Sequence, residues 1–177
     1  MFGGRITATQ VVRVEAVLDE IEKRRLTIPQ AAYVLATAHH ESDQWKALTE
    51  YASGKAYEGR IDLGNTRKGD GVRFKGRGFV MITGRRNYTD WAKRLGVDIV
   101  SKPRLVSELK YAVPILIDGM ILGTFTGKKL EDYFTADRSD WINARRIVNR
   151  LDKASLIAAH AKNFQTALDA ATEGDLT

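Results

Sequence analysis

The chain has no cysteine, only three prolines, and no continuous apolar run of the length that spans a membrane. Without cysteine it can form no disulfide framework, no thiol nucleophile and no cysteine-based metal site, and it suits a reducing compartment. The first residues also lack the order of a basic segment followed by an apolar one that marks a signal peptide. We therefore expect the protein to accumulate in the cytoplasm.

The 177 residues are enough to bury a substantial core, and we predict a single domain over residues 1–177. The formal net charge is +6 and the isoelectric point is about 9.6. These values favour polyanionic partners, either nucleic acid or an anionic cell wall or lipopolysaccharide surface. Because the basic residues are spread along the chain, the charge alone does not decide between these partners.

Apolar residues recur at helical spacing through most of the chain, which predicts a helical core over residues 7–42 and 87–171. The expected helices cover residues 9–25, 27–42, 88–95, 109–122 and 154–171, with shorter segments at 129–134 and 141–151. Thr7 or Thr9 is the candidate N-cap of the first helix, and Thr27 with Pro29 begins the second. Pro114 is expected to kink the fourth helix or to end its first part.

Residues 43–86 lose this helical periodicity and contain glycine at short intervals, a pattern typical of turns and short strands. The best strand candidates are residues 73–75 and 79–82. The sequence therefore predicts a mainly α fold in which a small irregular β lobe over residues 43–86 carries most of the polar candidate residues.

Three glutamates lie at the start of this polar stretch or inside it. Glu41 follows an apolar helical run, Glu50 comes nine residues later, and Glu58 follows Tyr57. A glycosidic bond is cut by two carboxyl groups, one that protonates the leaving oxygen and one that activates water or attacks. Burial against an apolar helix face favours the protonated form of a carboxyl group, which suits Glu41 as the acid. The alternative for Glu41 is a solvated glutamate at a helix end.

The histidines beside Glu41 do not form a recognisable metal motif. His39 and His40 lack the i, i+4 spacing of a helical zinc site, and His160 is far away in sequence. Gly76-Arg77-Gly78 lacks both the Lys-Ser/Thr ending of a P-loop and the third glycine of a dinucleotide fingerprint. We therefore expect no metal and no cofactor. The glycines then serve a tight turn or let the backbone approach a sugar.

Longer motifs resemble the family 19 glycoside hydrolases, which include plant-type chitinases and, more closely, lysozyme-like endolysins of bacteriophages and prophages. The resemblance lies in Ala38-His39-His40-Glu41-Ser42, Glu50-Tyr51, Leu63-Gly64-Asn65-Thr66, Gly69-Asp70-Gly71, Phe74-Lys75-Gly76-Arg77-Gly78-Phe79, Ile82-Thr83-Gly84-Arg85-Arg86-Asn87-Tyr88 and Ala144-Arg145-Arg146-Ile147-Val148-Asn149. It implies a lysozyme-like α+β fold in which the small β lobe flanks an active-site cleft.

The resemblance also implies roles for single residues. Glu41 would be the general acid, Glu50 the general base, and Thr83 would hold the attacking water, with Glu58 as a rival to Glu50. The predicted substrate contacts are His40, Tyr51, Tyr57, Glu58, Arg60, Arg77, Asn87, Tyr88, Arg145 and Asn149. Two residues depart from the family pattern: Met81 replaces the usual cleft glutamine, and Arg150 stands where glycine commonly follows the asparagine.

Together these residues predict an endolysin, a peptidoglycan hydrolase of inverting lysozyme type that cleaves the N-acetylmuramic acid–N-acetylglucosamine backbone. We expect a monomer that binds peptidoglycan glycan strands but not nucleic acid. It would stay in the host cytoplasm until a holin or other membrane-permeabilising partner releases it to the cell wall. The alternatives are a chitinase and a non-catalytic module that binds cell wall or nucleic acid. The paired carboxylates argue against the module, as does the lack of a row of aromatic and basic residues for base stacking.

Overall fold

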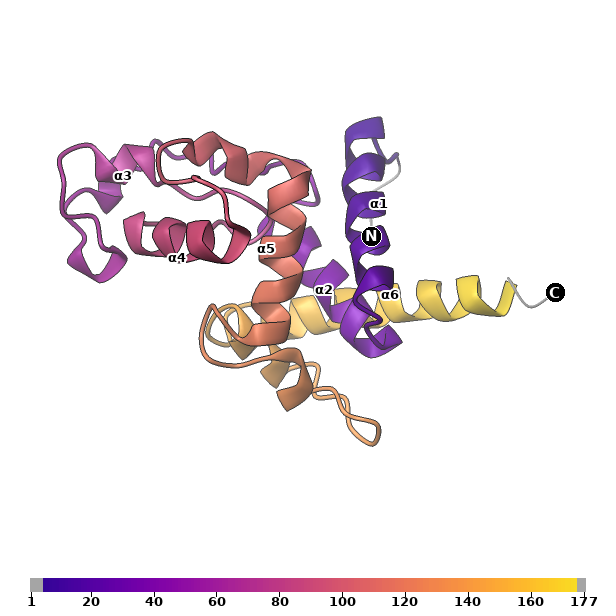
Figure 1. The fold of residues 1–177 in the computed structure, drawn as a ribbon. Helices are drawn as coiled ribbons and strands as arrows, with labels where there is room; N and C mark the ends of the chain where they lie inside the picture. Colours follow the sequence, from indigo (N-terminus) through magenta and orange to yellow (C-terminus); the bar gives the residue numbers. More distant parts are fainter. Residues whose placement is uncertain (1–4, 175–177) are drawn as a thin grey trace.

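The computed structural model describes residues 5–174, and its regular elements are almost all helical (Figure 1). The α-helices are α1 (Ala8–Lys23), α2 (Ile28–Glu41), α3 (Asp70–Arg73), α4 (Arg85–Leu95), α5 (Leu109–Leu122) and α6 (Ala154–Gly174). Short 3₁₀ helices connect them: η1 (Lys55–Tyr57), η2 (Ile61–Leu63), η3 (Pro103–Ser107), η4 (Leu130–Asp132) and η5 (Asn143–Ile147). The predicted mainly α fold is confirmed.

The first two helices begin with the same local motif. Thr7 caps α1 through a capping box, in which its side chain accepts from the Gln10 N–H and the Gln10 side chain accepts from the Thr7 N–H. Thr27 and Gln30 form the corresponding box at α2, with Pro29 in the first turn. The N-cap of the first helix is thus Thr7 and not Thr9.

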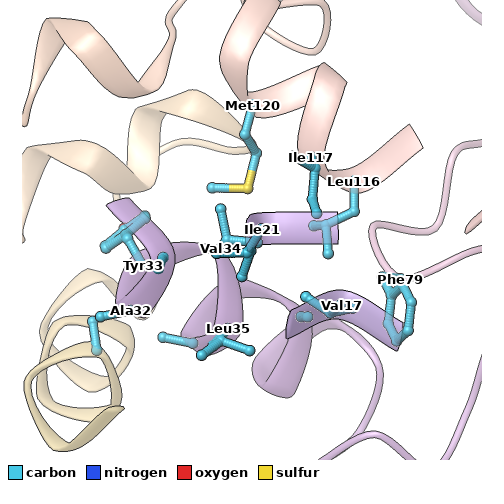
Figure 2. Packing of buried hydrophobic residues seen from close by; sticks show 14 of the residues in the cluster. Val17, Ile21, Ala32, Tyr33, Val34, Leu35, Phe79, Leu116, Ile117 and Met120 are labelled. Atoms are coloured by element: carbon cyan, nitrogen blue, oxygen red, sulfur yellow. The ribbon is translucent and has the colours of Figure 1, made fainter. Parts of the chain in front are cut away.

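The larger of two apolar cores surrounds α2, which is buried from Ala31 to His39. Figure 2 shows side chains of α1, α2 and α5 meeting in this core, among them Val17, Ile21, Val34, Leu35, Leu116, Ile117 and Met120. α6 closes the core from a further side through Ile157, Ala161 and Phe164. Burial of this much apolar surface is the main term that stabilises the arrangement. We call α1 and α2, the connection between them, and α6 the helical lobe.

A smaller core lies under the glycine-rich segment and α4. Its buried members are Phe74, Ile82, Tyr88, Trp91, Ile99, Val106 and Ile115. We call residues 43–107 the loop lobe; in Figure 1 its helices α3 and α4 lie to the left of α5, with α1 and α2 to the right. α5 contributes to both cores, because Ile115 packs into the smaller one while Leu116 packs into the larger one. Phe125, just after α5, also packs against both.

Both strand predictions are wrong. Residues 73–75 leave the end of α3, and residues 79–82 form a tight turn between Arg77 and Ile82. Gly78 (φ 75°) and Met81 (φ 50°) adopt left-handed backbone conformations there, which reverse the chain before a ladder can extend. Within the described part of the loop lobe, only the isolated antiparallel bridges Thr49–Arg77 and Arg77–Ile82 form.

Other helix boundaries differ from the sequence expectations in smaller ways. α5 continues through Pro114 to Leu122, so the proline does not end the first part of the helix. α4 already begins at Arg85, and only η5 forms a helical turn within residues 141–151. No helix within residues 5–174 is both long and apolar enough to cross a membrane.

Candidate active site

Glu41 is the last residue of α2, so the packing of that helix determines where its carboxylate lies. Ser42 caps the helix end, is fully buried, and donates its hydroxyl proton to the Ala38 carbonyl at 2.6 Å. Arg145 of η5 forms an ion pair with this carboxylate, with Nη1 2.5 Å from Oε1 of Glu41. The Glu41 side chain remains 20% exposed, whereas that of Arg145 is only 3% exposed. The other oxygen, Oε2, accepts no hydrogen bond from the described residues.

Glu50 is held by the loop lobe, and both of its carboxylate oxygens accept hydrogen bonds. Oε1 accepts from the Gly76 backbone N–H at 2.9 Å, and Oε2 accepts from the Tyr57 hydroxyl at 2.9 Å. The hydrogen bond to Glu50 also raises the pKa of the Tyr57 hydroxyl. The backbone is tied at the same place, because the Glu50 N–H donates to the Gly76 carbonyl at 3.0 Å. Both carboxylate oxygens of Glu50 are therefore fixed in position by hydrogen bonds from the loop lobe.

Glu58 has a different environment from Glu50. Its two carboxylate oxygens accept from the backbone N–H groups of Gly69 at 2.6 Å and Gly71 at 2.8 Å. A Cβ atom on Gly71 would lie 2.6 Å from the Glu58 nitrogen, so only glycine permits this close approach. These contacts tie η1 to the start of α3. We therefore assign Glu58 to the structure of the loop lobe and not to the substrate contacts predicted from the sequence.

Thr83 lies next to the bend that contains Met81. Its hydroxyl donates to the Met81 carbonyl at 2.8 Å, which uses the proton and leaves the oxygen lone pairs free to accept from a water molecule. Asn87 lies one helical turn later and donates from Nδ2 to the Thr83 carbonyl at 2.7 Å. Asn87 is exposed, so its amide oxygen is open to a ligand.

Two predicted substrate contacts, Arg77 and Tyr88, belong instead to the interior of the loop lobe. Tyr88 is fully buried and Arg77 is 7% exposed. Nη1 of Arg77 donates to the carbonyls of Arg73 and Lys75 and to the Tyr88 hydroxyl, and that hydroxyl donates to the Lys75 carbonyl. Burial raises the pKa of Tyr88 to about 12. Both side chains satisfy carbonyl groups inside the loop lobe. Tyr88 is closed off from the surface, whereas Arg77 still lines cavities between α3 and η3.

The remaining predicted contacts lie at or near the surface. Tyr51 is 78% exposed and its hydroxyl donates to Asp43 Oδ2 at 3.0 Å. Arg60 is exposed and pairs with Asp62, with Nη2 2.5 Å from Oδ2. His40 is partly buried in the last turn of α2. Asn149 is exposed just after η5, and its N–H donates to the carbonyl of Arg145, the residue that contacts Glu41.

Residues 5–174 contain no group of three histidine, aspartate or glutamate side chains arranged to hold a metal ion. His39 is 3% exposed and packs its ring against His160, with centroids 4.9 Å apart, and against Phe164. Burial, and secondly the neighbouring His160, lowers the pKa of His39 to about 4. His39 is therefore a residue of the α2–α6 contact.

The sequence and the fold were compared with those of known proteins. No family model matches the chain. A glycosyl hydrolase family 19 domain-containing protein of Haemophilus influenzae is 40% identical over 56 residues, which are 32% of this chain and 28% of that protein. The crystal structure of a bacterial family 19 chitinase superposes with a TM-score of 0.54 at 16% identity, covering 93% of this chain and 89% of the other.

Over these 56 residues the chain resembles a glycosyl hydrolase family 19 domain. Its fold is that of a family 19 chitinase, in agreement with the predicted lysozyme-like architecture. Chitinase C from Streptomyces griseus HUT6037 has a TM-score of 0.48 at 14% identity, covering 89% of this chain and 73% of the other. The sequence match spans well under two thirds of the Haemophilus protein, so its whole activity does not transfer with the fold.

Asn65 supports the site, although in the sequence it stands out only as part of a motif and has no predicted role. Asn65 is fully buried, donates from Nδ2 to the Tyr57 carbonyl at 2.8 Å, and accepts from the Arg85 N–H at 2.8 Å. It thereby ties the residue that binds Glu50 to the first turn of α4, which follows Thr83. An asparagine within a glycine-rich run signals a turn, but its two distant partners cannot be read from the sequence.

Proposed function

We propose that this protein is a glycoside hydrolase that cleaves the N-acetylmuramic acid–N-acetylglucosamine backbone of peptidoglycan. The observation that carries the proposal is the contrast between its two carboxylates. Within residues 5–174, one oxygen of Glu41 accepts from no donor while the other contacts Arg145, whereas Glu50 has donors on both oxygens. A general acid needs a free oxygen to deliver its proton, and a general base must stay ionised.

In this mechanism Glu41 protonates the glycosidic oxygen as the bond to the anomeric carbon breaks. Arg145 stabilises the carboxylate that remains after proton transfer. Glu50 removes a proton from a water molecule that Thr83 orients, and this water attacks the opposite face of the sugar. Water attack on that face inverts the anomeric configuration, and it requires carboxyl groups roughly 6.5–9.5 Å apart.

The charge of the loop lobe supports peptidoglycan over chitin. Two adjoining cavities of about 700 and 630 Å³ lie between α3 and η3, and the described residues that line them include no acidic side chain. Their basic lining residues are Arg73, Lys75, Arg77, Lys102 and Arg104. The peptide branches of peptidoglycan carry carboxylates that this surface can attract, whereas chitin carries none.

Chitin hydrolysis is the second candidate, and the likeness to a bacterial family 19 chitinase favours it. The test is the loss of turbidity of outer-membrane-permeabilised Gram-negative cells, measured beside the release of sugar from colloidal chitin. Analysis of the reducing ends and of their anomeric configuration identifies the cleaved bond and the stereochemistry. Glu41→Gln is the inactive control. Soluble products from chitin but none from the cell wall would make the protein a chitinase.

We also propose that the enzyme works as an endolysin, from the cytoplasm and with a membrane-permeabilising partner. α1 is amphipathic and packs Val17 and Ile21 into the larger core, so this segment is part of the folded domain. Expression alone should then leave Gram-negative cells intact, and chloroform or a pore-forming protein should trigger lysis. Spontaneous lysis, with the protein recovered from the periplasm, would contradict this proposal.

A further inference from the structure

The chain between the two carboxylates passes through a strained turn. Asp43, Gln44 and Trp45 have φ values of 49°, 57° and 69°, so three consecutive residues other than glycine adopt the left-handed conformation. This conformation costs roughly 1–2 kcal/mol per residue for L-amino acids. Such a turn persists only when the surrounding structure holds it in place.

Two side chains of α1 bind the carbonyl groups of this turn. Gln10 donates from Nε2 to the Gln44 carbonyl at 2.7 Å, and Arg13 donates from Nη1 to the Trp45 carbonyl at 2.5 Å. Gln10 is only 6% exposed, and burial lowers the pKa of the Arg13 guanidinium. Both hydrogen bonds are therefore partly shielded from water, which strengthens them and raises the cost of an unpaired partner.

The rest of the turn is attached to the residues around Glu41. The Gln44 N–H donates to the His39 carbonyl at 2.7 Å, and the Trp45 N–H donates to the buried Ser42 hydroxyl at 3.2 Å. The Trp45 ring is fully buried and meets Phe79 edge-on, with centroids 5.5 Å apart. α1 thus binds the carbonyl groups of the turn. The end of α2 accepts hydrogen bonds from its N–H groups, and Phe79 of the loop lobe packs against the Trp45 ring.

We propose that Gln10 and Arg13 are positioning residues for catalysis: they hold the Asp43–Trp45 turn and thereby set where Glu50 lies relative to Glu41. The kinetic part of this inference rests on the proposed hydrolase function. α1 supplies no side chain to either carboxylate among the contacts described above, so its effect would pass through the turn. A misplacement of about 1 Å in a catalytic group can reduce the rate by about 100-fold.

The sharpest test is Gln10→Glu, because it separates the two roles of this side chain. Oε1 of Gln10 accepts from the N–H and the hydroxyl of Thr7, both at 2.9 Å, and glutamate preserves these contacts. The substitution removes the N–H donor to Gln44 and places an oxygen opposite the carbonyl. Gln30→Glu is the matched control, because Gln30 occupies the same position in the capping box of α2.

For Gln10→Glu we expect kcat to fall about 10-fold or more with KM little changed. Amide exchange should accelerate at Gln44 and Ala47, whose N–H groups donate to the carbonyls of His39 and Ser42. Gln30→Glu should change neither readout. Faster exchange with wild-type kcat in the folded enzyme would reduce Gln10 to a stability role and overturn the proposal, and so would unchanged exchange.

Arg13 provides a second, independent pair of variants in case Gln10→Glu folds poorly. Arg13→Met keeps the apolar stem but loses the donor to Trp45, and it should reproduce the fall in kcat and the faster exchange. Arg13→Lys keeps one donor and should restore most of both, and equal effects in the two variants would count against the proposal. If the wild type cuts no glycan, the proposed function fails, and amide exchange alone then decides whether α1 holds the turn.

Discussion

The helical lobe and the loop lobe each hold one candidate catalytic carboxylate, and they hold it by different means. Glu41 ends a helix that is buried along most of its length, so apolar packing places it and a single ion pair orients it. Glu50 lies in a segment without regular structure, where a backbone N–H and a tyrosine hydroxyl place it. The position of the candidate acid therefore depends on packing in the larger core, and the position of the candidate base depends on individual hydrogen bonds.

The largest expected effect comes from Glu41→Gln, which tests the chemistry of the helical lobe without disturbing its packing. The amide is nearly isosteric and its oxygen can still accept from Arg145, but it cannot deliver a proton. Turnover should fall by about 10²–10⁴-fold or more. The melting temperature should stay close to that of the wild type. Substantial remaining activity in the folded variant would remove Glu41 from the mechanism.

In the loop lobe, Glu50→Gln and Glu58→Gln should separate chemistry from structure. Glu50→Gln should lose about 10²–10⁴-fold in turnover, since no ionised base remains. Glu58→Gln should keep turnover and lose about 1 kcal/mol of stability, because one glycine N–H loses its acceptor. Denaturant unfolding and turbidity assays on both variants measure the two quantities. The reverse pattern would make Glu58 the second catalytic carboxylate.

Acid should weaken the helical lobe through His39. Its pKa is about 4 in the folded protein and 6.5 in the unfolded chain, so the unfolded state binds the proton first as the pH falls. Stability should therefore be complete above about pH 6.5 and should decline toward pH 4, by at most about 3 kcal/mol. Denaturant unfolding across this range should show a shallower decline in His39→Gln. His40→Gln, at the partly exposed neighbour, is the control.

A smaller effect is expected for Tyr57→Phe, which removes one of the two donors to Glu50 and leaves the ring in place. A hydrogen bond to a charged group contributes about 1.5 kcal/mol, so turnover should fall about 10-fold. Tyr111→Phe, on α5, should leave turnover unchanged. An unaltered rate in Tyr57→Phe would mean that the Gly76 N–H alone is sufficient to hold the base.

The same contrast between the lobes explains what the sequence could predict. Apolar residues at helical spacing located α1, α2, α5 and α6, and Thr27 with Pro29 marked the start of α2 correctly. In the loop lobe the apolar run at 79–82 suggested a strand, but two left-handed residues fold it into a turn. The resemblance predicted Tyr88 and Arg77 as substrate contacts. In the structure both donate to backbone carbonyls, and no sequence pattern reveals such partners. Long-range polar contacts, unlike apolar periodicity, become visible only in the fold.

α5 packs into both apolar cores, and this couples the unfolding of the two lobes. Ile115 packs into the smaller core and Leu116 into the larger one, and Phe125 contacts both. Neither core can lose this helix without exposing apolar surface in the other. We therefore expect one cooperative transition, with equal calorimetric and van't Hoff enthalpies. Heating would then abolish the acid and the base together, and no partly unfolded intermediate would retain one of them.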